Sequence, residues 1–295
     1  MMVYGAIDIG SNAARLLICE VYENEGKLHF KKRSLVRVPL RLGEEVFATG
    51  SIPSEKMEDI VNTMKAYRHL LEVHGAIAYK AVATSAMRDA SNGEEIVDLV
   101  KNEAGIDIDI ISGKSEAEVL YTTHFEQTLD PKKSYLYIDV GGGSTELSLF
   151  SEGRIANTRS FNIGTLRLMK DQVSRSQWQE MKSWIEIHLK TSKDVLAIGS
   201  GGNINKLFKL NGARSDKKIS LMELQQLFEK LEGYSYMERM IELGMRSDRA
   251  DVIMPATRIF MKVMRWALIE EIYVPKFGLS DGIVRMLAKK LEFSA

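Results

Sequence analysis

A short apolar segment that ends in Asp-x-Gly occurs twice in this chain. Residues 4–10 read YGAIDIG, and residues 135–141, which lie 131 positions later, read YLYIDVG. A glycine turn and a second apolar segment follow each copy, at residues 16–18 and 147–149. Self-similarity at a fixed distance indicates that the chain is built from two related domains.

The order of the elements along the chain supports the same interpretation. Apolar alternation and helical spacing predict the order β-β-β-α-β-α after the start of each copy. In the first half we predict strands at 4–9, 13–21, 28–38, 77–83 and 106–111, and helices at 53–73, 93–104 and 116–125. After the second copy we predict strands at 154–161 and 195–198, and helices at 177–189 and 204–210. The predicted fold class is therefore α/β.

The polar, proline-containing stretch at residues 130–133 (DPKK) is the predicted domain boundary. It gives a first domain of residues 1–130 and a second domain of residues 131–279. We expect the last helix, at 280–291, to cross back, so that residues 280–295 join the first domain.

The composition limits the classes of function. Forty basic and 40 acidic residues give a net charge of zero, so we expect no nucleic-acid or membrane partner, and any anion site must be local. No apolar run approaches the roughly 18 residues of a membrane span. The first residues lead directly into a strand instead of a cleavable signal, which predicts a cytoplasmic protein. The five histidines have no metal-ligand spacing, and the single cysteine, Cys19, is expected to be a buried thiol.

Each repeated aspartate precedes turn residues that suit a phosphate group. A carboxylate at the end of a buried strand is costly unless it is paired, hydrogen-bonded or bound to a metal. Glycine lets backbone N–H groups approach a phosphate closely, and a carboxylate offers Mg²⁺ a hard oxygen ligand. The residues concerned are Asp8, Gly10, Ser11 and Asn12 in the first loop, and Asp139, Gly141, Gly142, Gly143, Ser144, Thr145 and Glu146 in the second.

A tight β-hairpin is the alternative for both loops. The residues of the first loop do not decide between the hairpin and a phosphate site. For the second loop the hairpin explains less, because three consecutive glycines lose more backbone entropy than a two-residue turn requires.

A third glycine cluster joins a predicted strand to a predicted helix. Free N–H groups and the helix dipole make such a junction an anion site. The cluster lacks the Lys-Ser/Thr ending of a P-loop and the glycine spacing of a dinucleotide fold. It consists of Gly199, Ser200, Gly201, Gly202 and Asn203.

Several segments, in the same order, resemble the exopolyphosphatase and guanosine pentaphosphate phosphatase family, within the superfamily of sugar kinases, actin and heat-shock chaperone ATPases. The strongest are 8–12 (DIGSN), 83–90 (ATSAMRDA), 111–117 (ISGKSEA) and 138–147 (IDVGGGSTEL), and weaker ones lie at 249–256 and 277–282. The resemblance spans nearly the whole chain. It implies an α/β fold of two ribonuclease H-like domains of the actin-like ATPase superfamily, flanking a central cleft.

The resemblance also implies roles for single residues. Glu116 falls where the family keeps its catalytic glutamate, Asp139 and Glu146 resemble its metal-site carboxylates, and Arg88 resembles its phosphate-gripping arginine. By themselves, the residues favour a first-turn carboxylate on the helix dipole for Glu116, and a surface ion pair with Asp89 or a neighbour is the alternative for Arg88. The implied cofactor is Mg²⁺, with Mn²⁺ as an alternative.

These inferences predict a phosphohydrolase that releases terminal orthophosphate from inorganic polyphosphate. Hydrolysis of guanosine pentaphosphate is the closest alternative, and the sequence does not separate the two substrates. An ATP-binding kinase-like protein or a sensor of a phosphate alarmone are alternatives of another class. A homodimer stays open.

Two further features bear on the substrate. Longer relatives carry an additional helical domain and a basic surface that are missing from this sequence, so short substrates are expected. Arg258, Lys262 and Arg265 fall at i, i+4 and i+7 of one predicted helix, where a solvated face is favoured over a polyphosphate path.

Overall fold

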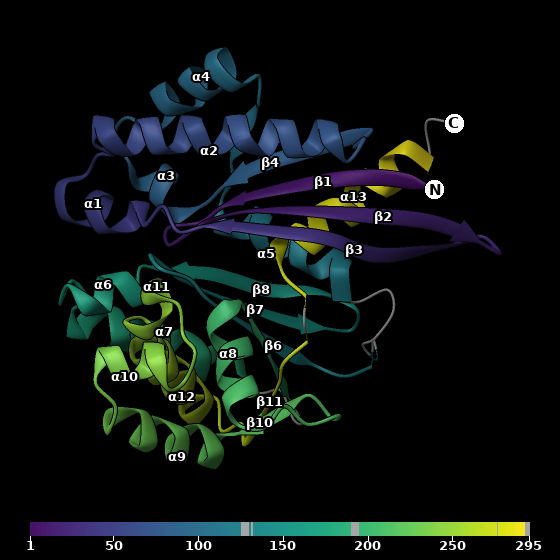
Figure 1. Cartoon of the computed structure of the whole chain (residues 1–295). Helices are drawn as coiled ribbons and strands as arrows, with labels where there is room; N and C mark the ends of the chain where they lie inside the picture. Colours follow the sequence, from purple (N-terminus) through teal and green to yellow (C-terminus); the bar gives the residue numbers. More distant parts are fainter. Residues whose placement is uncertain (125–129, 131, 190–194, 276, 293–295) are drawn as a thin grey trace. The chain divides into compact units, whose positions relative to one another are not determined.

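The structure is a computed structural model that describes residues 1–124, 130, 132–189, 195–275 and 277–292. The chain divides into two compact units (Figure 1). Unit 1 comprises Met1–Thr123 together with Gly278–Ala295, and unit 2 comprises His124–Phe277. Within the described part of the chain, no helix has the length and apolar character that crossing a membrane requires.

Unit 1 is built on a mixed sheet with the strand order β3-β2-β1-β4-β5. The pairs β1–β2 and β2–β3 are antiparallel, whereas β1–β4 and β4–β5 are parallel. Its strands are β1 (Met2–Ile9), β2 (Ala14–Asn24), β3 (Lys27–Val38), β4 (Ala78–Ala83) and β5 (Ile108–Ile110).

Two groups of helices cover this sheet. In Figure 1 the helices α2 and α4 lie together on one face, and α13 runs along β1 and β2. The buried side chains of Ile7, Leu16, Ile60 and Ile96 belong to the core under α2 and α4, which removes their apolar surface from water. The helices are α1 (Leu42–Thr49), α2 (Ser54–Val73), α3 (Ser85–Asp89), α4 (Gly93–Ala104), α5 (Gly113–His124) and α13 (Leu279–Glu292).

Unit 2 repeats this topology. Its strand order is β10-β11-β9-β6-β7-β8, so that β8-β7-β6-β9-β11 matches β3-β2-β1-β4-β5, with β10 added at one edge. The pairs β6–β9 and β9–β11 are parallel, and the pairs β6–β7, β7–β8 and β10–β11 are antiparallel. The strands are β6 (Tyr135–Val140), β7 (Thr145–Ser151), β8 (Arg154–Phe161), β9 (Leu196–Ser200), β10 (Lys218–Ser220) and β11 (Glu271–Tyr273).

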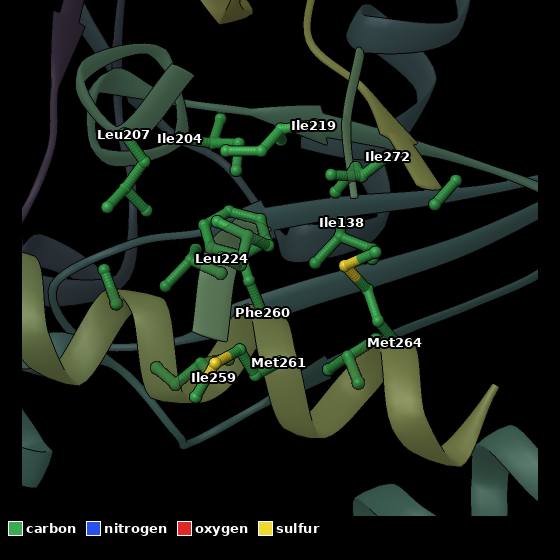
Figure 2. Close-up of a cluster of buried hydrophobic side chains, with 14 of the residues drawn as sticks. Ile138, Ile204, Leu207, Ile219, Leu224, Ile259, Phe260, Met261, Met264 and Ile272 are labelled. Carbon is green, nitrogen blue, oxygen red and sulfur yellow. The ribbon is translucent and has the colours of Figure 1, made fainter. Parts of the chain in front are cut away.

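The core of unit 2 lies between its sheet and the helix α12. Figure 2 shows Ile138 of β6, Leu224 of α9 and Phe260 of α12 gathered in one buried cluster. The helices are α6 (Thr165–Met169), α7 (Arg175–Leu189), α8 (Gly202–Leu210), α9 (Leu221–Glu232), α10 (Tyr236–Ile241), α11 (Ser247–Ala250) and α12 (Ile253–Trp266).

Most predicted elements are present, with shifted ends. The strand predicted at 154–161 is confirmed without change, and the helix predicted at 53–73 begins at Ser54. The helix predicted at 116–125 begins instead at Gly113, because the Ser112 hydroxyl accepts a hydrogen bond from the Ser115 N–H at 3.1 Å and caps the helix earlier. Residue 125, and residue 131 of the predicted boundary, lie outside the described residues.

Candidate active site

Three loops of unit 1 meet at one edge of its sheet. The strands β1, β4 and β5 are parallel, so their carboxyl ends lie at the same edge, where ligands of open α/β sheets bind. The loops and helix starts that follow these strands contain residues 10–13, 84–88 and 111–116. All site residues predicted for the first half are therefore near this edge.

Asp8 is held by a neighbouring arginine. The carboxylate is 6% exposed, and its Oδ2 accepts a hydrogen bond from Arg15 Nη1 at 2.8 Å. Asp8 and Arg15 are direct cross-strand partners, and Arg37 lies opposite Arg15 on the next strand. The result is a row of one acidic and two basic side chains on one face of the sheet.

The first glycine loop is fixed by its own bonds and by two helices. The N–H of Gly10 donates to Ala13 O at 3.1 Å, which closes the hairpin. The hydroxyls of Ser11 and Ser85 are 2.7 Å apart and buried, so the loop is tied to the start of α3. The carbonyl of Asn12 accepts from the Arg41 N–H at 3.1 Å, just before α1.

Arg88 and Glu116 are linked through one loop. Arg88 Nη1 donates to the carbonyl of Ile111 at 2.9 Å, and the Glu116 N–H donates to the carbonyl of the next residue, Ser112, also at 2.9 Å. Glu116 lies in the first turn of α5 and is half-buried. The contact of Arg88 is thus with the backbone of the loop before α5, and not the surface ion pair that was the alternative in the sequence.

Unit 2 carries a row of four polar side chains at the corresponding edge. Asp139 and Glu146 are direct cross-strand partners in β6 and β7. Ser200 lies beside Asp139 on β9, and Ser160 lies beside Glu146 on β8. The Oε1 atom of Glu146 accepts hydrogen bonds from Ser144 Oγ at 2.6 Å and from Ser160 Oγ at 2.9 Å. These bonds hold the carboxylate in one orientation.

The second glycine loop presents N–H groups because its carbonyls are already bonded. The carbonyls of Gly141 and Gly142 accept from the backbone of α6 at 3.0 and 2.8 Å, and Arg167 Nε donates to Gly143 O at 2.8 Å. Within the described residues, the N–H groups of Gly142 and Gly143 donate to no protein acceptor. Successive unused N–H groups in a turn form an anion-binding nest.

Gly164 allows α6 to lie against this loop. A Cβ atom at this position would be 2.3 Å from Gly142 O and 2.4 Å from the carbonyl carbon of Gly143. Only a residue without a side chain permits this approach, so Gly164 belongs to the structure of the nest.

Thr145 has a different environment from its neighbours in the second loop. It is completely buried, and its hydroxyl donates to the carbonyl of Ile163 at 2.5 Å. Because Glu146 faces the polar row, the side chain of the preceding residue points to the opposite, core face of the sheet. Thr145 is therefore not part of the proposed phosphate site.

The residues of the third glycine cluster have different structural environments. Gly199 packs in the core, where a Cβ atom would be 2.8 Å from Ile272 Cδ1. Gly201 has φ +94°, a conformation that side chains rarely permit, and a Cβ atom there would be 3.1 Å from Asp139 Oδ1. Gly202 and Asn203 begin α8, so their N–H groups lie at the positive end of the helix dipole.

Arg249 lies directly against the start of α8. A Cβ atom at Gly202 would be 2.5 and 2.6 Å from the two terminal nitrogens of the Arg249 guanidinium. Burial, together with the charges of Lys209 and Arg249, lowers the pKa of Lys206 in the second turn of α8. The Arg249 guanidinium adds a positive charge to the positive end of the α8 dipole, and this combination favours an anion.

The polar row of unit 2 suits a hard divalent cation. Ser200 is 1% exposed, and within the described residues its hydroxyl has no hydrogen-bond partner. This hydroxyl oxygen is therefore available as a ligand beside the Asp139 carboxylate. Mg²⁺ is typically bound by one or two carboxylates and keeps several waters. The same described residues contain no group of three or more His, Cys, Asp or Glu side chains arranged for a metal.

Comparison with known proteins assigns the family. Residues 23–291 match the Ppx/GppA phosphatase family. The chain belongs to this family. The family resemblance seen in the sequence is thus confirmed, and so is the α/β fold class.

Relatives and solved structures of the Ppx/GppA family match along the full length. Exopolyphosphatase 1 of Mycobacterium bovis is 24% identical over 314 residues, which cover 100% of this chain and 90% of that protein. The crystal structure of an exopolyphosphatase from Cytophaga hutchinsonii matches with a TM-score of 0.84 and 25% identity over 98% of each chain. The structure of the Aquifex aeolicus Ppx/GppA family member matches with a TM-score of 0.77 and 26% identity over 98% of each chain.

Three residues of the site were missed by the sequence interpretation. Arg15 could have been found, because it lies 131 positions before Glu146 and thus in the same place of the repeat. Gly164 and Arg249 reach the site only through the packing of α6 and α11, and no spacing in the sequence indicates this.

Two of the three basic residues of α12 contact aromatic rings, and Arg258 and Arg265 are exposed. Lys262 Nζ lies 5.0 Å from the ring centre of Trp178 and 5.4 Å from that of Trp266, and the Arg258 guanidinium lies over Phe228. Cation–π contacts of this kind tie α12 to α7 and α9. Lys262, the middle residue of the three, therefore contacts two aromatic rings.

Proposed function

We propose that this member of the Ppx/GppA phosphatase family releases terminal orthophosphate from inorganic polyphosphate. The single observation that carries the proposal is the second glycine loop, with two unused N–H groups beside the carboxylates of Asp139 and Glu146. A nest of N–H groups binds a phosphate, and paired carboxylates suit the cation that accompanies it.

The nest in unit 2 positions the reacting phosphoryl group. Phosphoryl transfer depends mainly on positioning and on charge stabilisation at the phosphate oxygens. The N–H groups of Gly142 and Gly143 supply fixed donors, and their carbonyls are anchored so that the donors do not reorient during the reaction. Asp139 and Glu146 would hold Mg²⁺, which supplies charge neutralisation on the phosphate oxygens when bound.

Glu116 in unit 1 is the proposed base. The Glu116 side chain is half-buried and so remains in contact with water. It lies in the first turn of the helix that follows the loop contacted by Arg88. It would orient the attacking water and accept its proton. Arg88 would bind phosphate oxygens with the part of its guanidinium that does not contact Ile111.

The names of two relatives lead us to propose polyphosphate as the substrate. The proteins of M. bovis and C. hutchinsonii that match along the full chain carry the name exopolyphosphatase. Guanosine pentaphosphate also ends in a phosphoanhydride and uses the same terminal chemistry. The proposal also includes the finer fold assignment, two ribonuclease H-like domains, which the repeated strand order of the sheets supports.

A substrate panel tests the proposal. Phosphate release is measured with polyphosphates of several lengths, guanosine pentaphosphate and ATP, each with Mg²⁺ and with Mn²⁺. We expect the highest kcat/KM with a polyphosphate. A higher value with guanosine pentaphosphate would reassign the substrate within the family. Tight binding of ATP or the alarmone without release of phosphate from any substrate would refute the hydrolase and favour an ATP-binding protein or a sensor.

A further inference from the structure

The polar rows of the two units occupy equivalent positions but carry opposite charge. Asp8 is paired in register with Arg15, and Asp139 is paired in register with Glu146. Both members of the second pair lie 131 positions after the corresponding members of the first. The repeat therefore keeps the aspartate and changes its cross-strand partner from arginine to glutamate.

The neighbours on both sides reinforce this difference. In unit 1 the row continues to Arg37 on one side and to Val82 on the other. In unit 2 it continues to two hydroxyl side chains, those of Ser160 and Ser200. Formal charges give a net +1 for the first row and a net −2 for the second. One row thus repels a cation, and the other offers it only oxygen ligands.

The contact at Asp8 places a permanent cation against one oxygen of this carboxylate. Arg15 Nη1 is 2.8 Å from Asp8 Oδ2, a charge-assisted hydrogen bond in which the guanidinium takes the place that a cation would occupy. The Asp8 side chain is 6% exposed and that of Arg15 is 34% exposed, so the guanidinium shields the carboxylate from solvent and repels a cation that approaches it. Ser200 gives an independent indication for the other row, since its buried hydroxyl has no partner among the described residues.

We propose that Arg15 confines divalent-cation binding to unit 2, so that the chain holds a single cation at its polar rows. The identity of the residue opposite the repeated aspartate decides the ligand: glutamate selects a cation, and arginine excludes it. Because the cation site in unit 2 is part of the proposed function, this inference rests on that function.

Titration with Mn²⁺ alone tests the inference without any substrate. The bound ion is counted by the loss of the electron paramagnetic resonance signal of free Mn²⁺. Wild-type protein is expected to bind one equivalent. Glu146→Gln, which keeps the size of the side chain and its contacts with both serines, is expected to weaken this binding at least tenfold. Glu232→Gln, a change at an exposed carboxylate of the same unit, is expected to have no effect.

The reciprocal change tests the role of Arg15 itself. Arg15→Glu is expected to raise the count from one to two equivalents. Lys27→Glu makes the same change of charge at an exposed position of the same sheet, where no ion pair is broken among the described residues, and is expected to leave the count at one. Thermal unfolding shows whether each variant is folded. If Arg15→Glu does not fold, the wild-type count and the Glu146→Gln titration decide.

The results that overturn the inference are specific. They are two equivalents in the wild type, no binding, binding that Glu146→Gln leaves unchanged, or a folded Arg15→Glu variant that still binds one equivalent. Phosphate release is measured separately. One bound Mn²⁺ without hydrolysis of any substrate refutes the proposed function alone, whereas hydrolysis with two bound ions refutes only the role of Arg15.

Discussion

Gly164→Ala tests whether the second glycine loop positions the phosphate. The glycine has φ −132°, which alanine also adopts, so any effect comes from the volume of the added methyl group. That methyl carbon would be 2.3 Å from Gly142 O, whereas real Cβ atoms essentially never approach within 3.0 Å. The loop or α6 must therefore move by at least 0.7 Å, the difference between these distances.

The size of this shift predicts the effect on activity. A misplacement of about 1 Å in a positioned group costs on the order of 100-fold in rate. We therefore expect Gly164→Ala to lower kcat/KM for polyphosphate by about 100-fold. Overpacking destabilises by about 1–3 kcal/mol, so the protein should still fold.

The assay compares phosphate release and thermal unfolding in three proteins. They are the wild type, Gly164→Ala and Gly278→Ala, a control position at which an added Cβ meets nothing within 4 Å. Gly278→Ala is expected to match the wild type. A folded Gly164→Ala protein with kcat/KM within threefold of the wild type would refute the role of this loop in positioning the substrate.

Three further predictions concern stability and the helix α12. Ser220→Ala should lower the free energy of unfolding by about 1 kcal/mol in urea titration, because it removes the cap on the Glu223 N–H. Burial alone would raise the pKa of Glu223, but hydrogen bonds, first that of the Ser220 N–H, lower it from 4.5 to about 2. The carboxylate therefore stabilises the fold above about pH 4.5 and loses this effect as the pH falls toward 2, so the difference in Tm between wild type and Glu223→Gln should shrink over that range. Lys262→Met should lower the free energy of unfolding by about 0.5–1 kcal/mol, because the contacts with Trp178 and Trp266 are lost, and should change the rate of phosphate release less than twofold. A large loss of rate with long polyphosphates would indicate that they bind along α12.

The repeat made the fold largely predictable from the sequence. Two copies of an apolar segment with Asp-x-Gly predict two related sheets, and the matching strand orders confirm them. Short helices such as α3 and α6 were not predicted, because five residues are too few to show a helical period. The helix α9 could have been found, since Ser220 and Glu223 form a capping box.

The glycines, the carboxylates and Arg88 of the candidate site could be predicted from the sequence, whereas Arg249 could not. Glycine turns after apolar strands have a local signature, so residues 8–12 and 139–146 stood out in the sequence. Arg15 is the cross-strand partner of Asp8 and could have been found from the repeat, whereas Arg249 reaches Gly202 only through the packing of helices that are distant in sequence. Thr145 shows that a residue of the motif need not belong to the site, because the alternation of the strand points its side chain into the core.

The most direct test of the account is the rate of phosphate release from polyphosphate by Glu116→Gln. Glu118→Gln is the matched control, because it makes the same change at an exposed position of the same helix. We expect Glu116→Gln to lose about 10²–10⁴-fold in kcat, as for the loss of a general base, while Glu118→Gln keeps the wild-type rate. Equal rates in Glu116→Gln and wild type, with both proteins folded, would contradict the assignment of the reacting water to Glu116.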